Sequence, residues 1–135
     1  MTTIEDYFVR QKELEAKYGS ESVVLMQVGS FYEAYGVSGE IGHAENVGKI
    51  LSMQVAYKNG RDKPHNIKNP QMVGFPDYAL GNHLEKLLRA NYTVAIYNQF
   101  DVPGKKEKIR KLVNVYSPGT FIDSEIDNEQ SGLAT

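Results

Sequence analysis

Cysteine is absent from this chain of 135 residues, which excludes a disulfide-stabilised fold and a zinc site built on thiolates. Long apolar segments are lacking as well. The run Val23–Met26 is far shorter than the roughly 20 residues that a membrane-spanning helix needs. Residues 1–6 do not have the basic and then apolar order of a signal peptide. We therefore expect an intracellular, non-secreted protein without a membrane partner.

The length is sufficient for one domain of ordinary size, and the composition is that of a globular protein. Hydrophobic residues make up 41% of the chain and charged residues 24%, so neither disorder nor a fibrous repeat accounts for the whole. Residues 123–135 are small and acidic, which is typical of a linker or tail. We expect a folded domain over residues 1–122 followed by this tail.

The chain lacks an overall excess of positive charge, since its net charge is −2, but its bases are concentrated in the middle of the chain. Residues 1–48 hold three bases and eight acids, whereas residues 49–111 hold twelve bases and five acids. Residues 112–135 hold four acids and no base. Contacts with phosphate depend on local charge, so the middle segment is compatible with nucleic-acid binding. On charge alone, ordinary solvation of surface lysines and arginines is the simpler interpretation of this pattern.

Periodicity and turn signals predict an α/β domain with a mixed β-sheet flanked by helices. Two capping-box patterns, Thr2-x-x-Glu5 and Ser30-x-x-Glu33, each predict the start of a helix. The second helix is expected to begin at Phe31 and to be interrupted early by glycines, namely Gly36, Gly39 and Gly42. The predicted helices cover residues 3–18, a short segment from 31, residues 45–51, and a segment capped by Asp77 or Asn82. The predicted strands cover 22–28, 53–57, 71–73, 92–100 and 108–116, with a long basic loop over 58–70.

No catalytic constellation is visible, so we expect neither a catalytic residue nor a metal or cofactor in this domain. The three histidines (His43, His65 and His83) lie in separate segments without ligand spacing. Asp6 and Glu15-x-Lys17 have the residue types of a metal-dependent nuclease, but all fall on the first predicted helix. Ordinary charges on a helix surface are the simpler interpretation.

The segment Val28–Glu33 is unusual because it places two aromatic rings, Phe31 and Tyr32, directly after a strand. An exposed phenylalanine indicates a contact surface. The alternative is that Phe31 packs on the core while Glu33 completes the helix cap. The residues alone leave both interpretations open.

Four motifs resemble the N-terminal mismatch-recognition domain of the MutS family of DNA mismatch repair proteins. They occur in the order typical of that family and span roughly residues 1–122. The matching segments are Gly29-Ser30-Phe31-Tyr32-Glu33, Gly74-Phe75-Pro76, Val94-Ala95-Ile96 with Gln99, and Ser117-Pro118-Gly119-Thr120.

The resemblance implies that Phe31 is a wedge inserted from the minor groove beside a mispaired base, and that Glu33 hydrogen-bonds that base. Insertion is cheaper at a mispair, which has already lost part of its pairing energy. The implied partner is double-stranded DNA with mismatches or small loops. The basic loop then supplies tentative contacts to the DNA backbone, with Lys58 favoured first; these candidates are Lys58, Arg61, Lys63 and Lys68.

The proteins of this family also contain a clamp domain, a connector domain and an ATPase domain, and these three domains are missing from this chain. The resemblance therefore implies a larger parent protein that forms homodimers or heterodimers and hydrolyses ATP with Mg elsewhere. Two other classes remain open: a small metal-dependent nuclease on a similar α/β scaffold, and a protein-interaction module that docks through its aromatic turn.

Overall fold

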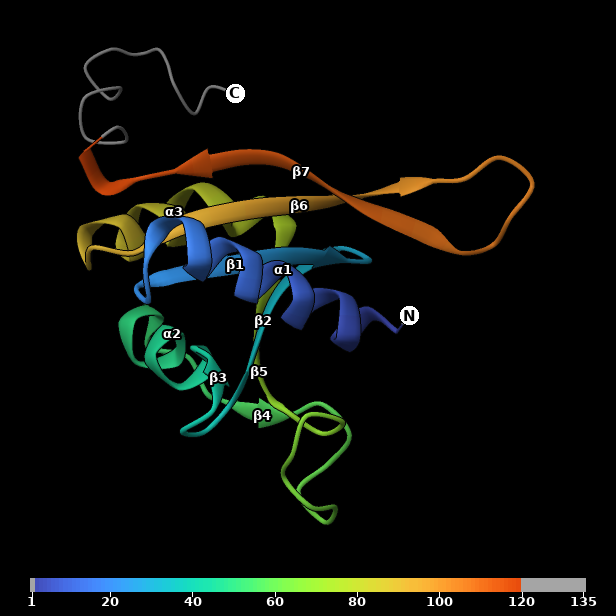
Figure 1. The fold of residues 1–135 in the computed structure, drawn as a ribbon, viewed down its shortest axis with the longest axis horizontal. Coiled ribbons are helices and arrows are strands. Elements are labelled where there is room, and N and C mark those ends of the chain that lie inside the picture. The colour runs from blue at the N-terminus through green and yellow to red at the C-terminus, as the bar shows by residue number, and fades with distance from the viewer. Residues whose placement is uncertain (1, 120–135) are drawn as a thin grey trace.

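The computed structural model describes residues 2–119 and has the α/β fold class that the sequence predicts, with a mixed sheet and flanking helices (Figure 1). The predicted tail over 123–135 and the end of the predicted domain, from residue 120, lie outside the described residues. The elements in chain order are α1 (Thr3–Tyr18), β1 (Ser22–Val28), β2 (Phe31–Val37), β3 (Ile41–Gly42), α2 (Ala44–Leu51), β4 (Ala56–Tyr57), β5 (Gln71–Pro76), the 3₁₀ turn η1 (Asp77–Ala79), α3 (Leu80–Arg89), β6 (Thr93–Asp101) and β7 (Lys108–Tyr116).

The sheet has the strand order β4-β5-β2-β1-β6-β7, with the short β3 paired to β2. The pair β1–β6 is parallel and the other pairs are antiparallel. The strands predicted on either side of the 58–70 loop are present as β4 and β5, and they pair with each other as a wide-looped hairpin.

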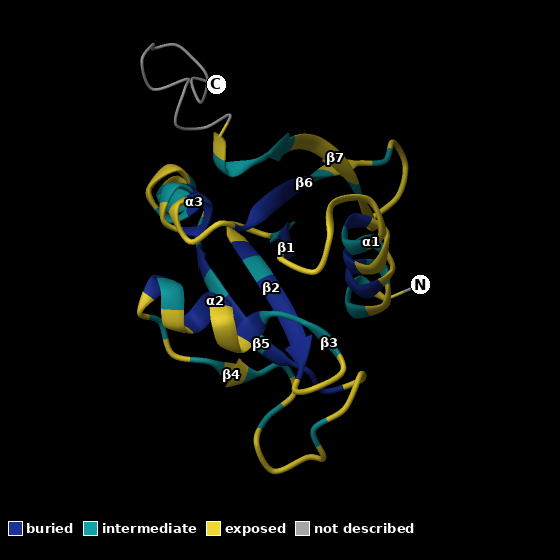
Figure 2. Ribbon diagram, turned by 60° about the vertical axis from the view of Figure 1, so that its left-hand side comes forward, coloured by how far each residue is buried: buried dark blue, intermediate teal, exposed yellow. Residues whose placement is uncertain are grey.

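Helix α1 covers one face of the sheet, and α2 and α3 cover the other (Figure 2). Successive side chains of a strand point to opposite faces, and β2 follows this rule. Tyr35 packs against Tyr7 of α1 with ring centroids 4.8 Å apart, whereas Tyr32 packs against Phe75, which in turn contacts His83 of α3. The core therefore lies in two layers, one on each side of the central strands β1, β2 and β6.

Helix α1 begins as predicted. The Thr2 hydroxyl accepts a hydrogen bond from the Glu5 N–H, and the Glu5 carboxylate accepts one from the Thr2 N–H. Two buried polar groups then tie the helix to β1. The Tyr7 hydroxyl donates to the Val24 carbonyl at 2.8 Å, and Gln11 exchanges hydrogen bonds with the backbone of the same strand.

The predicted helix from Phe31 is wrong, because this segment is strand β2. Gly29 has a φ of +64° and is followed by Ser30, which is the residue pattern of a two-residue type II′ hairpin turn. The hairpin turns β1 directly into β2, with Val28 opposite Phe31. Strand β2 also pairs with β5 over six positions, from Phe31–Pro76 to Gly36–Gln71. These tertiary pairings outweigh the local capping pattern.

The glycines expected to interrupt that helix belong instead to the β2–β3 hairpin. Gly36 and Gly42 lie opposite each other, and a Cβ on Gly42 would clash with the Tyr35 carbonyl oxygen.

The N-cap residues expected for α3 are also wrong. Asp77 begins the 3₁₀ turn, Asn82 lies inside α3, and Ala79 stands at the N-cap position. In the part of the chain that the structure describes, no helix has the length and apolar character needed to cross a membrane.

Candidate nucleic-acid interface

The turn that carries Phe31 is fixed to the neighbouring strand β6 by one side chain. The Gly29 N–H donates to Oε1 of Gln99 at 3.1 Å, and Nε2 of Gln99 donates to the Gly29 carbonyl at 2.9 Å. The backbone N–H of Gln99 donates to the side chain of Gln27, and Nε of Arg110 donates to the Gln27 carbonyl, both at 3.0 Å. The tip of the β1–β2 hairpin is therefore held by both β6 and β7.

Phe31 is exposed at this tip, whereas its neighbour Tyr32 is buried. The exposed fraction is 43% for Phe31 and 5% for Tyr32. The Tyr32 hydroxyl donates to Oδ1 of Asn98 at 2.6 Å, which holds that ring against the sheet. The interpretation of Phe31 as a core residue is wrong, and its ring is available for contact.

Glu33 lies two residues further along β2, on the same face as Phe31, and it caps no helix. Its carboxylate Oε1 accepts a hydrogen bond from Nζ of Lys58 at 3.1 Å and another from the Tyr35 hydroxyl. Both members of the ion pair are largely withdrawn from solvent, with side chains 13% exposed for Glu33 and 27% for Lys58. The glycine opposite Glu33, Gly74, leaves room for its side chain, because a Cβ there would lie 3.3 Å from Cγ of Glu33.

Tyr35 donates to this carboxylate as a neutral phenol. Burial raises the pKa of Tyr35 well above its ordinary value, and the hydrogen bond to Glu33 and the charge of that residue raise it further. The hydroxyl therefore keeps its proton throughout the physiological range. Sequence reasoning missed this role, because it placed Tyr35 inside a helix.

The 58–70 loop is organised around one buried amide. The side chain of Asn69 donates to three carbonyl groups of the loop and accepts a hydrogen bond from the Asn59 N–H at 2.7 Å. The guanidinium carbon of Arg61 lies over the ring of Tyr57, 5.0 Å from the ring centroid. The side chains of Lys63 and Lys68 are exposed. Of the four predicted backbone contacts, Arg61, Lys63 and Lys68 thus lie on the outside of an ordered loop, whereas Lys58 lies against Glu33.

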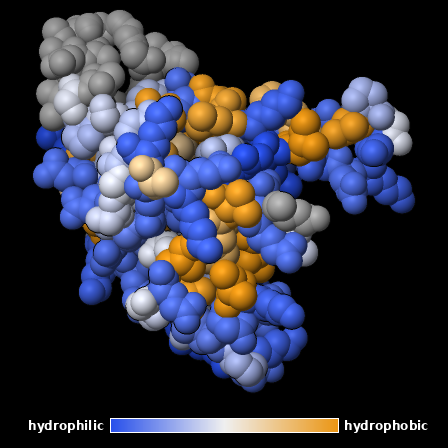
Figure 3. All heavy atoms as spheres, in the orientation of Figure 1, coloured by the Kyte–Doolittle hydropathy of each residue, from blue (hydrophilic) through white to orange (hydrophobic). Residues whose placement is uncertain are grey.

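A second basic segment projects from the other side of the hairpin tip. The β6–β7 arm, residues 99–111, extends beyond the body of the domain (Figure 1). Gln99, which pins the Phe31 turn, stands at its base. Apolar side chains interrupt the hydrophilic surface along the arm (Figure 3), Phe100 and Ile109 among them. The basic residues of the arm are Lys105, Lys106, Lys108, Arg110 and Lys111.

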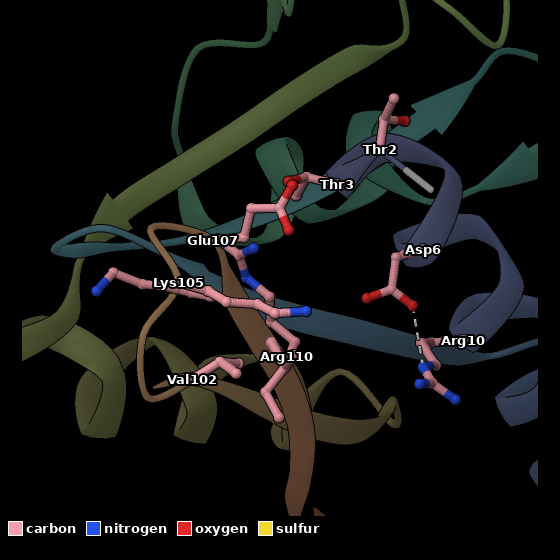
Figure 4. A pocket seen from close by; sticks show the side chains of 10 residues that line it. Thr2, Thr3, Asp6, Arg10, Val102, Lys105, Glu107 and Arg110 are labelled. Carbon is pink, nitrogen blue, oxygen red and sulfur yellow. Dashed lines mark ion pairs between the residues drawn. The ribbon is translucent and has the colours of Figure 1, made fainter.

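A cavity of about 640 Å³ lies between the N-terminal turns of α1 and this arm (Figure 4). Asp6 and Arg10 of α1 form an ion pair inside it, with Nε of Arg10 3.2 Å from Oδ1 of Asp6. Lys105 and Arg110 line its opposite wall. The cavity therefore carries a surplus of positive charge, but the carboxylate of Asp6 already has a partner.

The residues that suggested a nuclease are not brought together. Asp6 and Glu15 are nine positions apart on α1, about 13 Å along its axis. Glu15 lies 3.4 Å from Nε2 of His43, and Lys17 lies over the ring of Tyr18. Within residues 2–119, no group of three histidine, aspartate or glutamate side chains could hold a metal ion.

The histidines likewise occupy three separate settings. His43 packs edge-on against Tyr92, His65 accepts a hydrogen bond from the Ser38 N–H inside the loop region, and His83 packs against Phe75. Each therefore has a local structural contact in a different part of the fold.

Comparison with known proteins relates these features to a family. The family model of MutS domain I matches residues 7–125 of this chain. Among similar proteins, the DNA mismatch repair protein MutS of Thermotoga neapolitana is 31% identical over 131 residues, which are 96% of this chain. The proteins of the same name from Petrotoga mobilis and Parabacteroides distasonis are each 34% identical, over 84% and 87% of this chain. The chain spans only 12–14% of the length of these relatives.

The match of the family model covers most of the chain, including β2 with Phe31 and Glu33, the 58–70 loop and the β6–β7 arm. The motifs noted in the sequence lie within the matched range. The first three lie in one continuous sheet and its connections, and Ser117-Pro118-Gly119 directly follows the last strand, β7. This chain belongs to the MutS domain I family.

Proposed function

We propose that this chain is the mismatch-sensing, DNA-binding part of a MutS mismatch repair protein. In this proposal Phe31 enters the duplex from the minor groove as a wedge beside a mispaired base, and Glu33 hydrogen-bonds that base. The partner is double-stranded DNA that carries mismatches or small loops. The observation that carries the proposal is the exposed ring of Phe31 at the tip of a hairpin whose turn is pinned by Gln99.

The energetics of insertion support this role. Separating two stacked base pairs costs a few kcal/mol, and a mispair costs least because part of its pairing is already lost. A flexible wedge would lose further free energy on being ordered. The two hydrogen bonds between Gln99 and Gly29 hold the turn before DNA binds, so less order has to be gained at the moment of insertion.

The charges on either side of the tip support contact with a duplex. The loop that carries Arg61, Lys63 and Lys68 begins beside Glu33, and the basic β6–β7 arm begins at Gln99. Phosphate contacts of this kind fix the position of a protein on DNA without reading sequence. The aromatic wedge then supplies the preference for a mispair.

We also propose that the whole protein hydrolyses ATP with Mg in a part beyond this chain and acts as a homodimer or heterodimer. The support is that this chain spans only 12–14% of the length of relatives named MutS. Sequencing the reading frame beyond Thr135 tests this, because a phosphate-binding loop of the type Gly-x-x-x-x-Gly-Lys-Ser/Thr is expected there.

The DNA-binding proposal is tested by equilibrium titration of this chain with matched and mismatched duplexes of equal length at several salt concentrations. We expect tighter binding to the mismatched duplex. We also expect Lys63→Ala and Lys68→Ala to weaken both complexes alike. Each should lower the salt slope, which is the slope of log affinity against log salt concentration, by about one released counterion. Equal affinity for the two duplexes at low salt would contradict the proposal.

A further inference from the structure

The two oxygens of the Glu33 carboxylate are not equivalent. Oε1 accepts both protein hydrogen bonds, from Nζ of Lys58 and from the Tyr35 hydroxyl. Among residues 2–119, no side chain or backbone group donates a hydrogen bond to Oε2. A carboxylate has acceptor capacity on both oxygens, so Oε2 retains its capacity for an incoming donor.

Both donors are held in place by the fold. Tyr35 lies on the same face of β2 as Glu33, and its ring is packed in the core against Tyr7. The backbone of Lys58 is tied to the end of the sheet, because its N–H donates to the Pro70 carbonyl at 2.9 Å. Its ammonium group also lies 5.4 Å from the centroid of the Tyr35 ring. Lys58 is therefore fixed at the sheet, unlike Lys63 and Lys68 further out in the loop.

We propose that Lys58 and Tyr35 clamp Glu33 through Oε1, so that Oε2 is presented to a hydrogen-bond donor on the mispaired base. Lys58 is then a positioning residue that sets the discrimination between mismatched and matched DNA, and not a contact to phosphate. This inference rests on the proposed function, because it requires that Glu33 faces the base.

The clamp also lowers the electrostatic cost of placing Glu33 against DNA. A lone carboxylate on a DNA-facing surface is repelled by the phosphates, and its burial against the duplex costs free energy. The ion pair with Lys58 neutralises this charge within the protein and leaves one oxygen as an acceptor. A base that offers an imino hydrogen can bind there, whereas a fully paired base has already used that hydrogen in its pair.

The experiment compares three single-site variants of this chain in binding to matched and mismatched duplexes over a range of salt. Lys58→Met removes the ammonium group but keeps an unbranched stem, and Tyr35→Phe removes only the hydroxyl. Lys68→Met is the control, since it removes the same charge from the same loop without touching Glu33. Thermal unfolding of each variant verifies that it is folded.

We expect Lys58→Met and Tyr35→Phe each to lower the ratio of mismatched to matched affinity by about tenfold, the scale of one charged hydrogen bond. The salt slope should stay that of the native chain. Lys68→Met should lower both affinities equally and reduce the slope. In a Glu33→Ala background, Lys58→Met and Tyr35→Phe should have no further effect on the ratio, because their target is gone.

Equal losses on both duplexes with a lower salt slope in Lys58→Met would overturn the clamp and assign Lys58 to phosphate. An unchanged ratio in both Lys58→Met and Tyr35→Phe would overturn it as well. Phe31→Ala separates these outcomes from failure of the proposed function. If Phe31→Ala abolishes the mismatch preference while the clamp variants keep it, only the clamp fails. If the native chain shows no preference at low salt, the proposed function fails and the clamp with it.

Discussion

At the scale of residues, neighbouring side chains on one strand have opposite roles. Tyr32 is buried and hydrogen-bonded to Asn98, whereas Phe31 extends from the hairpin tip into solvent. The position of Phe31 depends on Gln99, whose amide group bonds both backbone groups of Gly29. In the proposed function, Gln99 therefore sets the position of the wedge through the backbone of Gly29.

We predict that Gln99→Ala loosens the hairpin tip without unfolding the domain. The loss of two hydrogen bonds should lower the free energy of unfolding by about 1–3 kcal/mol and weaken binding to mismatched DNA more than to matched DNA. Chemical denaturation and duplex titration measure the two effects. Gln54→Ala, at an exposed position after α2, is the matched control and should change neither. A Gln99→Ala chain with native mismatch preference would show that the tip does not need this support.

At the scale of elements, the β1–β2 hairpin carries the proposed wedge, and the β4–β5 hairpin supplies Lys58 to the proposed clamp. They are joined because β2 pairs with β5 along its first six residues. The tightest point of the first hairpin is Gly29, whose φ of +64° is unfavourable for any residue with a Cβ. The geometry of the turn therefore depends on this glycine.

We predict that Gly29→Ala destabilises the domain by about 1–2 kcal/mol because alanine is strained in this conformation. Gly81→Ala is the matched control. Gly81 lies in α3, where an added methyl group would meet nothing within 4 Å, so alanine should be neutral or stabilise the helix by up to about 1 kcal/mol. Thermal unfolding of both variants checks the sign of each change. A stabilised Gly29→Ala would refute the turn geometry.

The β1–β2 hairpin is also where the prediction from sequence fails, because the sequence predicts its second strand as a helix. Helix α1, strand β1 and strand β7 are predicted with their observed bounds, because capping and apolar patterns there agree with one another. At residues 29–33 two local patterns conflict. Ser30-x-x-Glu33 fits a helix cap, and Gly29-Ser30 fits a hairpin turn. The pairing of β2 with β5, across a long stretch of chain, decides the outcome, and no local pattern carries that information.

The candidate site is predictable in part. The exposed aromatic Phe31, the carboxylate Glu33 and the basic loop all come from motifs visible in the sequence. The contact between Glu33 and Lys58 could not be predicted, because it depends on the registers of β2 with β5 and of β5 with β4. Charge alone favours phosphate as the partner of Lys58, and the clamp is the alternative that the geometry suggests.

At the scale of the whole molecule, buried tyrosines join the helices to the sheet. Burial raises the pKa of Tyr7, and it does the same for Tyr32, Tyr35, Tyr97 and Tyr116. The Tyr7 hydroxyl donates to the Val24 carbonyl, which requires the neutral form. These groups keep their protons in the folded chain at a pH where the unfolded chain loses them.

We predict that stability falls at alkaline pH. The contribution of Tyr7 is fully present below the ordinary tyrosine pKa of 10.0 and is lost as the pH rises above it, by about 1.4 kcal/mol per pH unit. Tyr7→Phe should therefore show a shallower decline in chemical denaturation between about pH 9 and 11.5, the range around that value. Tyr78→Phe, at a position that is 88% exposed, is the control and should keep the native slope. Equal slopes for the native chain and Tyr7→Phe would contradict this account.

The most direct test of the central claim is Phe31→Ala, with folding stability and DNA binding measured on the same protein. Because the ring is exposed, we expect the free energy of unfolding to change by less than about 1 kcal/mol, far below the roughly 3–5 kcal/mol of a buried phenylalanine. Affinity for a mismatched duplex should fall by about 1–3 kcal/mol, the scale of one base–aromatic stack, while matched-duplex binding through phosphates persists. A Phe31→Ala chain that is strongly destabilised, or that keeps its full preference for the mismatch, would contradict the wedge.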